Sequence, residues 1–161
     1  MKLYHGSTYH VERPIVIRGR ISTDFGKGFY TTTNFEQAKR WAISKADTDK
    51  EAKAIVTTYE VDDDLIYKKK YQTKVFASPD EAWLKFVFNC RKELGHTYDI
   101  VMGPVANDKI YTTINLFESG VLSIEETIAR LRVSEYFNQI SFHSDVAIKE
   151  LTFIKSEVVT E

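Results

Sequence analysis

Apolar and polar positions along this chain predict short strands mixed with amphipathic helices. Runs of β-branched and aromatic residues bounded by turn residues predict strands at 3–5, 15–17, 28–32, 54–61, 65–71, 98–102, 138–142 and 151–158. The strands do not alternate strictly with helices. We therefore expect an α+β fold with a mostly antiparallel, split sheet and surrounding helices.

Helix starts are marked by pairs in which a Ser or Thr precedes a Glu by three positions, the pattern of a capping box. The pairs are Thr33 with Glu36, Ser78 with Glu81 and Ser123 with Glu126. They predict helices over 34–50, 79–94 and 123–131. A further helix is expected from 107 or 108 to 119, ended by Gly120, and a helical turn or two over 144–150.

Length and composition indicate one folded domain over 1–161. The chain has 161 residues, 43% hydrophobic and 13% aromatic, so it has enough apolar material for a core and too little length for two ordinary domains. Cys90 is the single cysteine, which excludes an intrachain disulfide and a multi-cysteine metal site. No signal-peptide core or membrane-length apolar stretch occurs, so we expect a cytoplasmic protein or one exported by a dedicated secretion system.

The charge pattern gives no reason to expect nucleic-acid binding. The net charge is −1 and the pI is near 6.4, whereas phosphate neutralisation needs a basic surface. The one basic cluster, Lys68-Lys69-Lys70, is interpreted as a solvated strand edge, with a nucleic-acid patch as the alternative.

The segments richest in candidate chemistry are Tyr4-His5-Gly6-Ser7 and 24–33, which reads Asp-Phe-Gly-Lys-Gly-Phe-Tyr-Thr-Thr-Thr, with Trp41 following. A glycine turn that leads an aromatic into a strand, with a second aromatic on the next helix, can form a clamp for a flat heteroaromatic ring. The glycine pair at 26 and 28 lacks the third glycine of a dinucleotide fingerprint and precedes a strand, so a Rossmann site is not expected.

These segments resemble the NAD-binding half of the ADP-ribosyltransferase superfamily, in its diphtheria-toxin-like and poly-ADP-ribose-polymerase-like branch. The chain is also similar to an uncharacterised bacterial branch whose members share the motif at 24–30 and the motif at 98–105. The resemblance implies that NAD is a substrate, with no metal. It implies that His5 bonds a ribose, that the backbone at Gly6 holds the nicotinamide amide, and that the nicotinamide lies between Tyr30 and Trp41. Ser7 and Gly28 would line the same site.

The resemblance also assigns the late strand a glutamate that binds a ribose hydroxyl and stabilises an oxocarbenium-like transition state. Gln139 stands at that position here. A neutral glutamine fits a slow transferase, a substrate-assisted one or an inactive binder. Glu135, on the same face of an ideal strand, is a weaker carboxylate candidate. Further candidates are Arg18 and Arg20 for the pyrophosphate, and Asn107 and Asp108 for substrate orientation.

The function expected from the resemblance is mono-ADP-ribosylation of a macromolecule, either protein or nucleic acid. A toxin of a bacterial toxin-antitoxin pair, with an antitoxin protein as partner and no membrane, is the setting that the family suggests. The alternatives are a noncatalytic module that binds NAD or ADP-ribose and an NAD glycohydrolase. An NAD-dependent RNA phosphotransferase is less favoured because clustered arginines are lacking.

Overall fold

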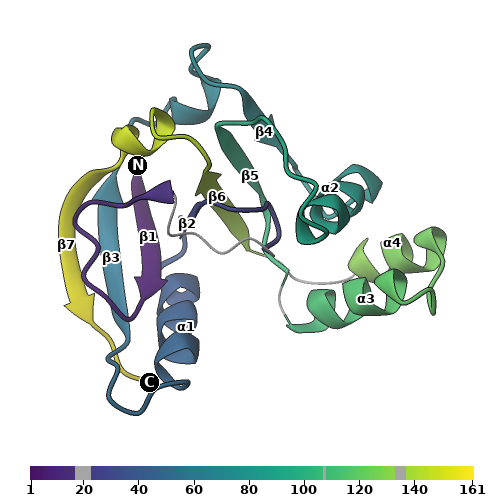
Figure 1. Cartoon of the computed structure of the whole chain (residues 1–161), viewed down its shortest axis with the longest axis horizontal. Helices are drawn as coiled ribbons and strands as arrows, with labels where there is room; N and C mark the ends of the chain where they lie inside the picture. Colours follow the sequence, from purple (N-terminus) through teal and green to yellow (C-terminus); the bar gives the residue numbers. More distant parts are fainter. Residues whose placement is uncertain (17–22, 107, 133–136) are drawn as a thin grey trace.

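The computed structural model describes residues 1–16, 23–106, 108–132 and 137–161, which form one seven-stranded sheet with helices (Figure 1). The strand order is β4-β5-β6-β2-β1-β3-β7. The strands are β1 (Lys2–Ser7), β2 (Phe29–Thr32), β3 (Ile55–Glu60), β4 (Thr73–Val75), β5 (Ile100–Pro104), β6 (Asn138–Phe142) and β7 (Thr152–Val158). Only the β4–β5 pair is parallel among the described strands. The α+β class and the mostly antiparallel sheet are confirmed.

The sheet is nearly divided between β1 and β2. These strands share one paired position, Tyr4 opposite Thr32, whereas β1 pairs with β3 along its whole length. One half consists of β4, β5, β6 and β2, and the other of β1, β3 and β7. Past Tyr4 the edges of β1 and β2 separate, so backbone groups at the separation are available to side chains or to a ligand.

The helices are divided between the two halves of the sheet (Figure 1). Helix α1 (Phe35–Ala46) lies on β1 and β3, where its small residues Ala38 and Ala42 pack against Ala54 and Val56. Helix α2 (Glu81–Arg91) lies near β5, and α3 (Asp108–Glu118) and α4 (Ile124–Arg132) pack on each other farther from the sheet, with α3 in contact with α2. No helix of the described residues is long and apolar enough to cross a membrane.

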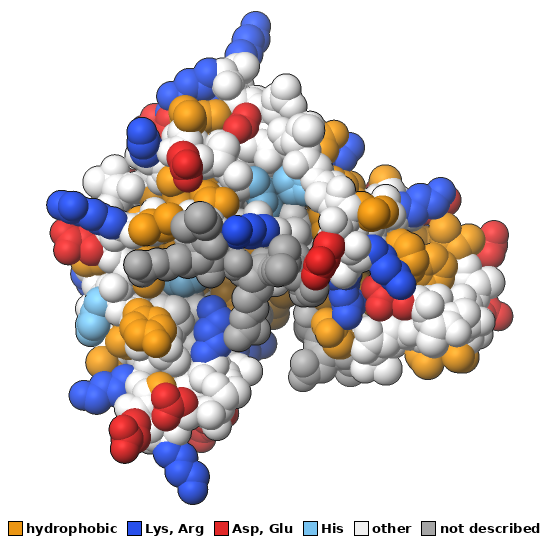
Figure 2. All heavy atoms as spheres, in the orientation of Figure 1, with side chains coloured by type: hydrophobic (Ala, Val, Ile, Leu, Met, Phe, Trp, Pro, Cys, Tyr) orange, Lys and Arg blue, Asp and Glu red, His pale blue; other side chains and the backbone are white. Residues whose placement is uncertain are grey.

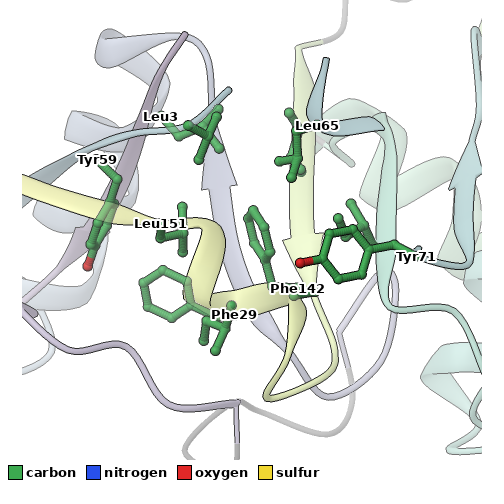
Figure 3. Packing of buried hydrophobic residues seen from close by; sticks show 12 residues of the cluster. Leu3, Phe29, Tyr59, Leu65, Tyr71, Phe142 and Leu151 are labelled. Atoms are coloured by element: carbon green, nitrogen blue, oxygen red, sulfur yellow. The ribbon is translucent and has the colours of Figure 1, made fainter. Parts of the chain in front are cut away.

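The opposite face of the sheet is covered by loops and by two 3₁₀ turns, η2 (Leu65–Tyr67) and η3 (Ala147–Glu150). Figure 3 shows side chains from distant parts of the chain converging there, among them Leu3, Phe29, Phe142 and Leu151. This cluster spans both halves of the sheet. It therefore holds together two sets of strands that share little backbone pairing.

Two helix starts differ from the capping boxes expected. Asn34 caps α1, and its side chain accepts a bond from the amide of Gln37 at 3.0 Å. Asp80 caps α2 in the same way through the amide of Trp83 at 2.9 Å. Asn and Asp cap at least as well as Ser and Thr, and in both helices the Asn or Asp directly precedes the first helical residue. The Ser123–Glu126 box at α4 is confirmed by reciprocal bonds of 3.0 and 3.1 Å.

Other boundaries were also wrong. The strand expected over 65–71 is absent: residues 65–67 form η2, and residues 68–71 are a turn in which Lys68 bonds Asp62 and Glu150 at 2.5 and 2.7 Å. Residues 15 and 16 are not in a strand, and residue 17 lies outside the described residues. Helix α1 ends at Ala46 instead of residue 50, and α2 ends at Arg91 before Glu93 adopts φ 61°.

Candidate functional site

The imidazole of His5 bridges the gap where β1 and β2 separate. Its Nδ1 lies 2.6 Å from the main-chain oxygen of Tyr30, and its ring stacks on Phe29 at a centroid distance of 4.2 Å. A carbonyl only accepts, so Nδ1 carries the proton and Nε2 is the acceptor nitrogen. Burial and the charge of Lys45 lower the pKa of His5 to about 3, so the ring is neutral. Among the described residues, Nε2 has no hydrogen-bond partner.

Gly6, next along β1, is in contact with α1 through both its α-carbon and its carbonyl. A β-carbon at Gly6 would lie 2.0 Å from the carbonyl oxygen of Ala38. The glycine is therefore required by the close approach of α1, which is a different reason from the ligand approach that the sequence suggested. The carbonyl of Gly6 accepts a 2.6 Å bond from the ammonium of Lys45, so a ligand amide at this backbone would compete with Lys45.

Tyr30 is bound to the turn that precedes it. Its hydroxyl donates to the carbonyl of Gly26 at 2.5 Å, accepts from the amide of Phe25 at 3.0 Å and contacts the hydroxyl of Thr23 at 2.8 Å. Burial, the largest cause, raises the pKa of the phenol. The ring lies nearly parallel to Phe25 at 6.5 Å and edge-on to His143 at 6.2 Å. Tyr30 thus shapes the turn over residues 23–28 besides any contact with a ligand.

Trp41 shares a face of α1 with Lys45. It stands one helical turn before Lys45, and residues four apart share a helix face. Because Lys45 reaches Gly6, that face lies toward the end of β1. The indole is half-buried, and the described aromatic rings include no stacking partner for it, Tyr30 among them. The clamp between Tyr30 and Trp41 stays a prediction.

Two neutral histidines, His96 and His143, hold the same turn from outside. Nε2 of His96 donates to the carbonyl of Phe25 at 2.8 Å, and Nδ1 of His143 donates to the carbonyl of Lys27 at 2.7 Å. Burial is the main cause that lowers both pKa values, that of His143 to about 4. The ring of His143 also explains Gly28, whose β-carbon would lie 2.7 Å from it. Sequence reasoning assigned no role to either histidine.

These two rings line a cavity of about 620 Å³ that also contains Lys27, Asp99 and Asp145. It lies beside the turn, and none of His5, Gly6, Trp41 or Gln139 lines it. Both nitrogens of His96 are engaged, because Nδ1 accepts from the amide of Tyr98 at 3.0 Å. Nε2 of His143 accepts from the Ser141 hydroxyl at 2.7 Å. The imidazoles at this cavity therefore hold structure and offer no open nitrogen.

Gln139 lies on β6, opposite Thr32 of β2, and is 3% exposed. Its Nε2 donates to the carboxylate of Asp24 at 3.0 Å and lies 3.4 Å from the carbonyl oxygen of Pro104. Asp24 also accepts from the amide of Ala106 at 3.1 Å. The residue at the expected acidic position is thus paired with a carboxylate from another part of the chain. Asp24 opens the motif at 24–30, yet sequence reasoning assigned it no role.

The remaining candidates are placed as follows. Ser7 is buried, and its hydroxyl donates to the carbonyl of Tyr9 at 2.8 Å, so it forms a local turn. Arg18, Arg20, Asn107 and Glu135 lie outside the described residues, as does the side chain of Asp108. The described residues contain no group of three or more His, Cys, Asp or Glu side chains arranged to hold a metal ion.

The surface carries both signs of charge. On the face drawn in Figure 2, Lys and Arg side chains are interspersed with Asp and Glu, and histidine side chains are visible near its middle. This face has no continuous basic patch among the described residues, which agrees with the net charge of −1.

A family model described as protein of unknown function (DUF3990) matches residues 1–153. The chain belongs to this family. No curated protein and no solved structure matches the chain. The match covers nearly the whole chain, from β1 into β7.

Proposed function

We propose that this DUF3990 protein is an NAD-dependent mono-ADP-ribosyltransferase. The observation that supports it best is the state of His5. A neutral imidazole is fixed at the gap in the sheet by the carbonyl of Tyr30, and its Nε2 has no partner among the described residues. Such a nitrogen accepts a hydrogen bond from a ribose hydroxyl. The neighbouring backbone of Gly6 and the Trp41 face of α1 would then hold the nicotinamide.

The proposed reaction breaks the bond between the nicotinamide nitrogen and C1′ of the ribose. The electron pair of that bond leaves with nicotinamide, which becomes neutral. An acceptor nucleophile then bonds C1′ and loses its proton to solvent. An aromatic side chain beside the pyridinium stabilises its positive charge in the ground state by about 0.5–2 kcal/mol, so its main task is to position the ring.

The test is release of nicotinamide from NAD, followed with and without cell-extract protein and nucleic acid as acceptors. We expect label from adenine-labelled NAD to become attached to a macromolecule. We expect His5→Ala to lower turnover at least tenfold. The matched control is His10→Ala, which removes an exposed histidine near the same strand. Equal turnover in wild type and His5→Ala would contradict the assignment. Label found only in free ADP-ribose, with none on a macromolecule, would indicate a glycohydrolase.

The second candidate is a noncatalytic module that binds NAD or ADP-ribose. Two observations favour it: Gln139 carries no charge, and Lys45 occupies the carbonyl of Gly6. Calorimetry decides between the two. Micromolar binding of NAD with no nicotinamide formed over hours supports the module, whereas turnover in the same sample supports the enzyme.

A further inference from the structure

The carboxylate of Asp24 lies next to Gln139, the residue that stands where the sequence resemblance implied an acid. Its Oδ2 accepts two bonds, from Nε2 of Gln139 at 3.0 Å and from the amide of Ala106 at 3.1 Å. Its Oδ1 has no hydrogen-bond partner among the described residues. Asp24 is half-buried while Gln139 is 3% exposed, so Asp24 is the more exposed residue of the pair.

The hydrogen bonds determine why residue 139 is a glutamine. Its Nε2 faces two oxygen acceptors, the carboxylate of Asp24 and the carbonyl of Pro104. Only the amide nitrogen satisfies both, so the orientation of the side-chain amide is fixed. A glutamate at 139 would place its carboxylate against Asp24, and two adjacent carboxylates do not both ionise readily. The pair therefore has room for one negative charge, and Asp24 is the member that can carry it.

The described part of the chain places no counter-ion in contact with that charge. Among the described residues, no Lys or Arg forms an ion pair with Asp24. Burial is the largest cause that raises its pKa, while the bonds from Ala106 and Gln139 and the charge of Arg91 on α2 oppose the rise. Of the described residues, the other titratable groups near it are the phenol of Tyr30 on β2 and the thiol of Cys90 on α2.

We propose that Asp24 is the carboxylate that stabilises the positive charge developing on the ribose, and that Gln139 positions it. This inference rests on the proposed function and names the charged group of the same site. Oδ1 of Asp24 accepts the hydrogen bond of a ribose hydroxyl, while Oδ2 stays bonded to Gln139 and Ala106. As the bond from C1′ to nicotinamide breaks, Asp24 supplies electrostatic stabilisation only. It forms no covalent bond and keeps no proton.

The experiment is a double-mutant cycle, in which nicotinamide release is measured with the full chain. The variants are Asp24→Asn, Gln139→Glu and the double variant. We expect Asp24→Asn to lower kcat by about 10²- to 10³-fold, because one preorganised electrostatic group is removed. Gln139→Glu also lowers kcat, since it puts two carboxylates together. The double variant restores one charge to the pair, so we expect at least tenfold more activity than Asp24→Asn.

The matched control is Asp99→Asn. Asp99 also accepts a main-chain amide bond, from Gln72 at 2.9 Å, but it lies at the separate cavity. We expect its kcat to stay within about twofold of wild type. Thermal unfolding of every variant shows which ones fold. The pH profile adds a second readout, because the rise of kcat with pH that Asp24 ionisation causes disappears in Asp24→Asn.

The outcomes separate the two proposals. Active wild type with equally active Asp24→Asn overturns the role of Asp24 and leaves the transferase assignment standing. A double variant no better than Asp24→Asn, with all variants folded, also overturns it, because the pair is then a structural bond only. Wild type that neither binds NAD nor releases nicotinamide overturns the proposed function and this inference with it.

Discussion

The ammonium of Lys45 donates a 2.6 Å hydrogen bond to the main-chain carbonyl of Gly6. This contact joins α1 to β1 at the place where the sheet separates, and its charge lowers the pKa of the adjacent His5. Under the proposed function, a nicotinamide amide would compete with Lys45 for this carbonyl. Lys45 and His5 are therefore coupled both electrostatically and through the proposed substrate.

Lys45→Met tests this coupling without any assumption about function. The methionine keeps most of the apolar stem and removes the charge, so we expect the pKa of His5 to rise above about 3. It stays below the ordinary value because burial is the larger cause. NMR titration of the imidazole resonances measures the change. Lys50→Met is the control, since Lys50 is exposed beyond α1. An unchanged pKa in Lys45→Met would contradict the contact.

Tyr30→Phe separates the hydroxyl of Tyr30 from its ring. The variant leaves the amide of Phe25 without its 3.0 Å acceptor and removes the bond to Gly26. We expect unfolding free energy to fall by about 1–3 kcal/mol, measured by urea denaturation. Under the clamp hypothesis the ring still contacts nicotinamide, so kcat of folded Tyr30→Phe should stay within about fivefold of wild type. The Tyr30→Ala variant should lose most of the wild-type kcat. Equal activity in both variants would remove Tyr30 from the site.

Much of this fold follows from the local sequence, as the strand at residues 138–142 and the Ser123–Glu126 box illustrate. What local sequence did not predict depends on partners far along the chain. Asp24 meets Gln139 across 115 positions, and His143 meets Lys27 across 116. Periodicity and capping rules describe neighbours within a few residues, so such pairs are invisible to them. The motif at 24–30 was predicted as a ligand-binding segment. The hydrogen bonds from two distant histidines to its carbonyls were not predicted.

Gly6→Ala tests the packing reason for this glycine. The new β-carbon would lie 2.0 Å from the carbonyl of Ala38 and 2.8 Å from the amide of Ala42, so α1 would have to move as a unit. We expect a loss of about 3 kcal/mol or more in unfolding free energy. Gly120→Ala is the control: its φ is +78° but nothing lies within 4 Å of the added carbon. Its cost should be about 1 kcal/mol, from backbone strain alone. Similar losses in both variants would show that α1 yields easily.

Acid should destabilise the protein through its neutral histidines. The pKa is lowered to about 3 at His5 and about 4 at His143, and it is lowered at His96 as well. The unfolded chain then binds more protons than the native one below about pH 6.5, so stability falls as pH falls from 7 to 5. Asp24, whose pKa is raised, acts in the opposite direction, so the decisive comparison is between variants.

His143→Gln removes one of these groups. We expect it to lower the melting temperature at pH 7, because the bonds to Lys27 and Ser141 are weakened. We also expect a smaller further decrease between pH 7 and pH 5 than in wild type, by roughly 1 kcal/mol of unfolding free energy. Calorimetric scans at both pH values measure it. His10→Gln at the exposed histidine should keep the wild-type pH dependence. A pH dependence in His143→Gln as steep as in wild type would mean that folding does not lower the pKa of His143.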